Sequence, residues 1–143
     1  MKRKTKKEPI PKTRCSGRMS EAQFTTFVKN QLRGASWKWA PISEVFTAAR
    51  VGRGVYRCNK CENNVPLKVV VNGKRIKNVF VDHILPVVDP DIGWVGWDSF
   101  INRLYCEREG LQVLCGQCHD EKTSEEKSVA TERRRKDKEV IDT

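Results

Sequence analysis

Two pairs of cysteines have the spacing of a metal site. Cys58 and Cys61 form one CxxC pair, and Cys115 and Cys118 form the other. Two intervening residues let both thiolates reach one ion from a tight turn, and structural zinc takes four such ligands in a tetrahedron. A single pair can be redox-active, whereas two pairs without a nearby acidic ligand indicate a closed structural zinc site. An iron–sulfur cluster is the alternative metal centre.

The two pairs are far apart in the sequence. The 53 residues between Cys61 and Cys115 greatly exceed the roughly 15–20 residues of a compact two-pair zinc finger. We therefore expect zinc to clamp the two ends of an inserted unit, which is the part of the chain where side chains capable of chemistry are expected. The remaining cysteines, Cys15 and Cys106, fall outside both pairs and are predicted to be free thiols.

The chain has two histidines, and both have neighbours that could take part in metal chemistry. His83 follows Asp82 where a predicted strand ends, because Pro86 cannot continue strand pairing. His119 follows the second cysteine pair, in the first turn of a predicted helix. Polar groups satisfied inside the core are the alternative interpretation. If zinc draws strand and helix together, a carboxylate and an imidazole can bind a divalent ion while a second imidazole acts as base.

Hydrophobic spacing predicts the elements that must position these side chains. Apolar residues recur at helical intervals after Ser20, which can cap a helix, and after Pro41, which suits a first helical turn. Further helices are predicted at 97–105 and from near His119 into the basic run that begins at Arg133.

The middle of the chain, at 55–88, is predicted to form β-structure. Two runs there, 67–71 and 76–81, are rich in β-branched residues and flank Asn72-Gly73. An Asn-Gly pair between such runs is a strong hairpin signal, so we expect a hairpin with its turn at this position. The polar and Gly-containing segment 89–93 is predicted to be a loop.

The chain is strongly basic, with 28 Lys and Arg against 18 Asp and Glu and a net charge of +10. A small basic protein attracts polyanions, most often nucleic acid, although ribosomal and membrane-surface proteins share this property. We expect the basic runs at both ends to contact nucleic acid, with solvated tails as the alternative. The predicted nucleic-acid-binding residues are Lys2, Arg3, Lys4, Lys6, Lys7, Arg133, Arg134 and Arg135.

No apolar stretch follows the basic N-terminus, so we expect neither a signal peptide nor a membrane span. A cytoplasmic location is therefore expected, where cysteines bind metals more often than they form disulfides. We predict a basic arm without stable structure at 1–18 and a helical segment that packs on the core at 19–54. The domain with both cysteine pairs is predicted at 55–127, followed by a helical extension and basic tail at 128–143.

Three segments together resemble the HNH endonuclease family, and especially its small stand-alone bacteriophage members. They are Asp82-His83-Ile84, the run from Leu111 to His119, and Lys122-Thr123. The resemblance covers about half of the chain, and it is specific because two cysteine pairs and both histidines occur in one order. It implies an α+β fold, in which a zinc-stapled ββα-metal unit carries flanking helices.

The resemblance also implies roles for the site residues. His83 matches the general base that activates water, His119 matches the metal-binding histidine, and Asp82 matches the carboxylate that binds the same ion. The implied cofactors are structural Zn²⁺ and a catalytic Mg²⁺, Mn²⁺ or other divalent ion, which would polarise the phosphate and stabilise the departing 3′ oxygen. The implied activity is phosphodiester hydrolysis in DNA, with nicking as the natural result of one active site.

One position departs from the family pattern. The family has asparagine immediately before the Leu-Gln pair, and this chain has Gly110 there. In the family that side chain ties the loop to the strand that carries the catalytic histidine. Asn102, eight residues earlier, is a candidate substitute, and a surface position on a helix is its alternative interpretation. Glycine at 110 could also supply a backbone conformation with positive φ.

Two other functional classes fit the charge and the cysteines. One is a zinc-stapled DNA-binding protein without catalysis, and the other is an RNA- or ribosome-associated zinc protein. Only the nuclease uses the Asp82-His83 pair and His119. DNA is the expected partner and a membrane is not; a homodimer and phage packaging proteins are further partners that the sequence leaves open. For a phage protein the expected location is the cytoplasm of the bacterial host.

Overall fold

The computed structural model describes residues 5–142, and within them the chain is a mixed α+β protein with four α-helices and three small antiparallel sheets. The α-helices are α1 (Glu21–Ser36), α2 (Ala40–Ala48), α3 (Trp97–Leu104) and α4 (Gly116–Ile141). The strands are β1 (Arg50–Gly52), β2 (Val55–Arg57), β3 (Asn64–Pro66), β4 (Lys68–Val71), β5 (Lys74–Lys77), β6 (Val79–His83) and β7 (Leu111–Cys115), and a short 3-10 helix, η1 (Arg108–Gly110), precedes β7. The chain forms two compact units, Met1–Ala35 and Ser36–Thr143.

The first unit contains an irregular segment and most of α1. Residues 5–13 have no regular secondary structure, and Lys6 and Lys7 are exposed there. Ser20 caps α1, since its Oγ accepts the Gln23 N–H at 3.2 Å while Gln23 Oε1 accepts the Ser20 N–H at 2.9 Å. The predicted nucleic-acid contacts Lys2, Arg3 and Lys4 lie outside the described residues.

The second unit contains the predicted hairpin in a shorter form. Strands β4 and β5 pair in antiparallel fashion around Asn72-Gly73, whose φ angles are 49° and 75°. Positive φ at both central residues is the requirement of a tight hairpin turn, and Asn and Gly meet it readily. The second strand ends at Lys77 instead of continuing to Val81, because Asn78 turns away and accepts the Gly116 N–H on its backbone oxygen at 3.0 Å.

The residues after Asn78 form a different strand pair with a distant segment. Strand β6 pairs with β7 in antiparallel register, so that Val79 lies opposite Cys115 and His83 lies opposite Leu111. Helix α4 begins directly after β7, at Gly116. Two strands from separate parts of the sequence and the helix that follows them thus form a β6–β7–α4 unit, which contains Asp82, His83 and His119.

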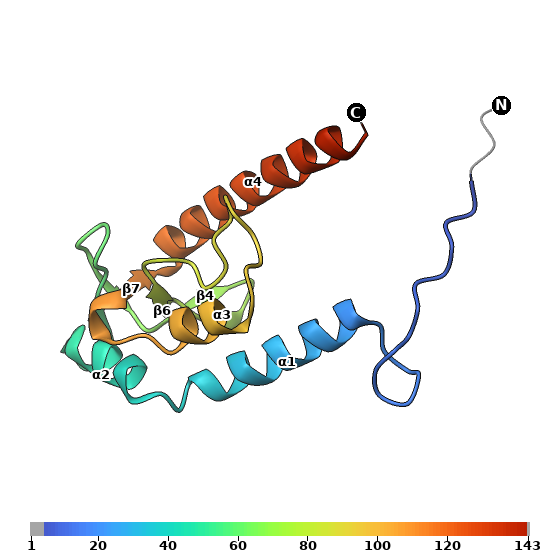
Figure 1. Ribbon diagram of the computed structural model, residues 1–143. Coiled ribbons are helices and arrows are strands. Elements are labelled where there is room, and N and C mark those ends of the chain that lie inside the picture. The colour runs from blue at the N-terminus through green and yellow to red at the C-terminus, as the bar shows by residue number, and fades with distance from the viewer. Residues whose placement is uncertain (1–4, 143) are drawn as a thin grey trace. The chain divides into compact units, whose positions relative to one another are not determined.

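The β6–β7 pair lies between two helices (Figure 1). Side chains alternate between the faces of a strand, so Val79 and Val81 face one side and Phe80 and Asp82 face the other. The first face packs against Val45 and Phe46 of α2 and against Ala49, which follows that helix, and the second faces α4. The largest fully buried side chains of the protein are Phe100, Leu114, Val79, Val113 and Cys58. Among the described residues, no helix combines the length and apolar character needed to cross a membrane.

Candidate metal centre and catalytic side chains

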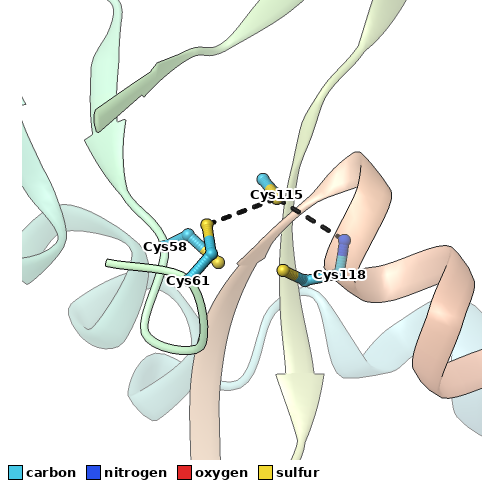
Figure 2. Close-up of side chains that lie close together, drawn as sticks. All are labelled: Cys58, Cys61, Cys115 and Cys118. Atoms are coloured by element: carbon cyan, nitrogen blue, oxygen red, sulfur yellow. Dashed lines mark hydrogen bonds between the residues drawn. The ribbon is translucent and has the colours of Figure 1, made fainter. Parts of the chain in front are cut away.

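The four paired cysteines come together at one point of the second unit. Cys58 and Cys61 lie on the turn after β2, Cys115 ends β7, and Cys118 lies in the first turn of α4 (Figure 2). Their sulfur atoms all lie within 4.8 Å of one another, and no other group of three or more potential Cys, His, Asp or Glu ligands converges between residues 5 and 142. Four thiols in this arrangement can hold one tetrahedral metal ion such as zinc.

Backbone hydrogen bonds shape both cysteine turns. In the first turn, Cys58 donates its N–H to Asn63 O at 3.0 Å, and Glu62, with φ at 63°, donates its N–H to Cys58 O at 3.0 Å. In the second, the Cys118 N–H points at Cys115 Sγ, 3.5 Å away. N–H groups directed at sulfur stabilise thiolates, the form that binds metal.

The thiols of the cluster differ in their tendency to ionise. Burial raises the pKa of the Cys58 thiol, but hydrogen bonds from backbone N–H groups outweigh burial and lower the pKa to about 6. Burial and the neighbouring sulfur atoms raise the pKa of Cys118 to about 12 and also raise that of Cys115. Metal binding to this cluster should therefore release protons from the two raised thiols.

Asn59 connects the first cysteine turn to the strand that carries the second pair. Its backbone N–H donates to Val113 O at 2.8 Å, and its side-chain oxygen accepts the Val113 N–H at 2.6 Å. These two hydrogen bonds join the turn of the first cysteine pair to β7, the strand that ends at Cys115. No local pattern predicts this role of Asn59, because its partner lies 54 positions away.

His83 ends β6 and points to the α2 side, on the same face as Val81. Its Nε2 lies 2.8 Å from Leu104 O at the end of α3. A carbonyl oxygen can only accept a hydrogen bond, so the proton belongs on Nε2 and the neutral ring keeps a free lone pair on Nδ1. A carbonyl that fixes the tautomer in this way leaves a nitrogen that can act as a base.

Asp82 points to the opposite face, toward α4. Its Oδ2 accepts hydrogen bonds from Gln112 Nε2 at 2.9 Å and from Lys122 Nζ at 2.7 Å. Burial lowers the pKa of Lys122, but its contacts with Asp82 and Glu126 outweigh burial and raise the pKa. The structure therefore places Asp82 and His83 on different sides of the strand pair, and Lys122 is a partner that sequence reasoning missed.

His119 lies on the α4 side, together with Asp82. Its ring stacks on Phe80, with 4.4 Å between ring centroids and 17° between planes. Its Nδ1 is buried and makes no hydrogen bond to any described residue. Asp120 Oδ1 lies 3.7 Å from this nitrogen. The Asp82 carboxylate and the His119 imidazole therefore face the same β6–α4 interface, and both are ordinary ligand types for divalent ions.

Gly110 lies where the loop before β7 approaches two segments of the chain. Its carbonyl accepts the Ile84 N–H at 2.9 Å, so the backbone ties this loop to the residue after His83. A Cβ added at Gly110 would lie 2.9 Å from Cys106 Sγ and 3.2 Å from Cys106 Cβ. Asn102 is exposed on α3. The backbone of Gly110 supplies a connection that the resemblance assigns to an asparagine side chain.

The three arginines predicted to contact nucleic acid have different surroundings on α4. Arg133 is mostly buried, and its Nε donates to Pro90 O at 3.0 Å. Arg135 is exposed and pairs with Glu132 and Glu139 on its own helix. Arg134 is also exposed. Arg133 thus holds the loop at residues 89–93 against α4, whereas Arg134 and Arg135 are on the surface.

A cleft of about 340 Å³ opens beside His83 on the α2 side. Its lining residues include Trp37, which is 70% exposed, and the aliphatic and cationic side chain of Lys77. The other lining residues are Ser36, Ile42, Ser43, Phe46 and Val81. Since no carboxylate lines the cleft, it presents a neutral to positive surface next to the imidazole.

The chain was compared with known protein families, curated proteins and solved structures. No known family model, curated protein or solved structure matches the chain. The functional argument therefore rests on the residues and geometry of this protein.

Proposed function

We propose that this protein is a metal-dependent DNA endonuclease of the HNH type, with a ββα-metal fold stapled by zinc. The observation that supports this most is the β6–β7–α4 unit. It carries the Asp82-His83 pair at the end of one strand and His119 in the first turns of the helix. The four-cysteine cluster lies at the junction of the same strand pair and helix. This order of residues along one strand pair and one helix supports the roles that the resemblance implies.

In this proposal His83 is the general base. Its Nδ1 takes a proton from water, the water oxygen bonds to phosphorus, and the bond from phosphorus to the 3′ oxygen breaks. Leu104 O holds the ring in the required tautomer through Nε2. A divalent ion held by Asp82 and His119 would supply positive charge for the phosphate and the departing oxygen.

The opposite directions of Asp82 and His83 restrict where the DNA strand can lie. A phosphate that reaches both groups has to pass the end of β6, because the strand itself separates their side chains. The cleft beside His83 could receive the sugar-phosphate backbone there, since Lys77 lines it and no carboxylate does. The overall charge of +10 favours the approach of a polyanion to the protein as a whole.

Plasmid nicking tests this proposal. We expect zinc-loaded protein to relax supercoiled DNA with Mg²⁺ or Mn²⁺ and to lose this activity with EDTA. His83→Ala should lower the rate roughly 100-fold or more, the usual loss when a general base is removed. Lys127→Ala, an exposed position on α4, is the matched control and should cleave as the wild type does. Equal rates for His83→Ala and wild type would exclude the assigned base.

A zinc-stapled DNA- or RNA-binding protein without catalysis is the second candidate. One observation favours it: Asp82 already has two partners, Gln112 and Lys122, so its carboxylate is satisfied without a metal ion. In that case the purified protein would bind nucleic acid in a salt-sensitive manner and leave the plasmid supercoiled under every metal condition. A salt titration of nucleic-acid binding, together with the nicking assay, therefore separates the two functions.

A further inference from the structure

Lys122 occupies a position that suits a metal ion. From α4, its Nζ lies 2.7 Å from Asp82 Oδ2, 2.6 Å from His83 O and 3.0 Å from Glu126 Oε1. The lysine side chain is 20% exposed and that of Asp82 is 17% exposed. An ammonium group is thus held by two carboxylates and a carbonyl, which are the oxygen ligands that hard divalent cations also prefer.

Two buried polar atoms nearby make no hydrogen bond of good geometry, although each lies within ion-pair distance of a charged neighbour, Lys122 for Glu126 Oε1 and Asp120 for His119 Nδ1. His119 lies three residues before Lys122 on α4. Buried polar atoms of this kind are uncommon in folded proteins and call for an explanation, such as an ion.

We propose that Lys122 is a resident counter-ion of Asp82, which has to release the carboxylate before a divalent ion can bind. This inference rests on the proposed function, in which Asp82 is a metal ligand. Lys122 neutralises Asp82 while the ion is absent, and it repels an incoming cation through its own positive charge. It therefore sets the metal concentration at which the site fills, and is a positioning residue rather than a catalytic one.

Metal binding to a variant that lacks the ammonium group tests this directly. We would titrate zinc-loaded protein with Mn²⁺ and follow the free ion by electron paramagnetic resonance, without DNA. Lys122→Met should bind Mn²⁺ about tenfold more tightly than the wild type, because one positive charge has left the site. Lys127→Met is the matched control, since it removes the same charge from an exposed position of the same helix, and it should bind as the wild type does.

The outcomes separate this proposal from the proposed function. Equal or weaker Mn²⁺ binding by Lys122→Met overturns it and makes Lys122 a structural tie between α4 and β6. If the wild type nicks DNA and binds Mn²⁺ in a manner that Asp82→Asn abolishes, the function stands while the counter-ion role fails. If neither wild type nor Lys122→Met binds Mn²⁺, the counter-ion role and the metal part of the proposed function fail together.

A measurement on the wild type covers the case in which Lys122→Met does not fold. Lysines can be acylated with an amine-reactive ester and the modified positions read by mass spectrometry. Saturating Mn²⁺ should increase the labelling of Lys122 several-fold, since displacement from Asp82 exposes its Nζ, while Lys127 should change little. Unchanged labelling of Lys122 under Mn²⁺ saturation would contradict its release.

Discussion

At the scale of single residues, Gly110 is the position where the chain departs from the pattern of the HNH family that it resembles. Its carbonyl already joins the loop to Ile84, the residue after the candidate base. The space in front of its Cα is filled by Cys106. Any residue with a Cβ, asparagine included, would have to displace the Cys106 side chain at this position.

A substitution at Gly110 should accordingly destabilise the protein. Gly110→Ala places a Cβ 2.9 Å from Cys106 Sγ, and crowding of this kind costs about 1–3 kcal/mol in the free energy of unfolding. Urea unfolding of the zinc-loaded protein measures the loss. The cost should shrink when Cys106→Ala removes the sulfur atom, in a double-mutant cycle. An equal cost in both backgrounds would show that the contact is not its cause.

At the scale of elements, α4 carries adjacent basic side chains in two different environments. Arg133 packs its guanidinium group against Gly93, whose φ is 88°, and donates to Pro90 O, so it fixes a loop. Arg134, its neighbour, is exposed. Adjacent positions of a helix point about 100° apart. The sequence of a basic run therefore does not show which of its side chains are buried and which are exposed.

The adjacent arginines provide a matched test of this division. Arg133→Ala should lower the free energy of unfolding by about 1–2 kcal/mol, because a partly buried hydrogen bond and its packing are lost. Arg134→Ala should leave stability within about 0.5 kcal/mol and weaken DNA binding instead. Chemical denaturation and DNA titration of both variants measure these effects. The assignment is wrong if Arg133→Ala is as stable as the wild type.

The sequence predicted elements with strong local signals and missed those that depend on distant partners. The Asn72-Gly73 turn and the last helix follow from local preferences, and both are present, although the helix predicted from near His119 begins at Gly116. Strand β7 was not anticipated, since four of its five residues are buried and no alternation of polar and apolar residues marks it. The end of the hairpin strand at Lys77 depends on Asn78 bonding to Gly116, 38 positions away.

The sequence likewise predicted the part of the candidate site that has a local spacing signal and missed the part that depends on distant contacts. The cysteine spacing indicated the four-sulfur cluster, which the structure contains. The predicted convergence of Asp82, His83 and His119 assumes that the strand ends at the Asp82-His83 pair. Strand β6 includes both residues, and the structure divides the three side chains between two faces. Lys122 belongs to one of the segments that resemble the HNH family, but that resemblance assigns it no partner. Its contact with Asp82 spans 40 positions and follows only from the packing of α4 on β6.

At the scale of the whole molecule, the small core should make a metal ion at the four cysteines important for stability. One of the buried clusters consists of Leu114 and three of the paired cysteines, Cys58, Cys115 and Cys118. Loss of a bound metal ion would therefore leave three thiols in the core without the ion that they hold. Cys58→Ser should abolish binding of one zinc per chain and unfold much of the second unit. Zinc content and circular dichroism measure this, and Cys15→Ser, at an exposed free cysteine, should keep both. A Cys58→Ser protein that stays folded without metal would refute the structural role.

The net charge of +10 should make DNA binding by the whole protein strongly dependent on salt. Each phosphate contact adds about 0.9 to the slope of log affinity against log salt concentration, because binding releases condensed counterions. Replacing exposed Lys6 and Lys7 with alanine should therefore reduce that slope by about 1.8 if both contact phosphates. Fluorescence anisotropy with a short duplex between about 50 and 200 mM salt gives the slope for each protein. An unchanged slope would show that the N-terminal lysines are solvated in the complex and that the affinity comes from basic residues elsewhere.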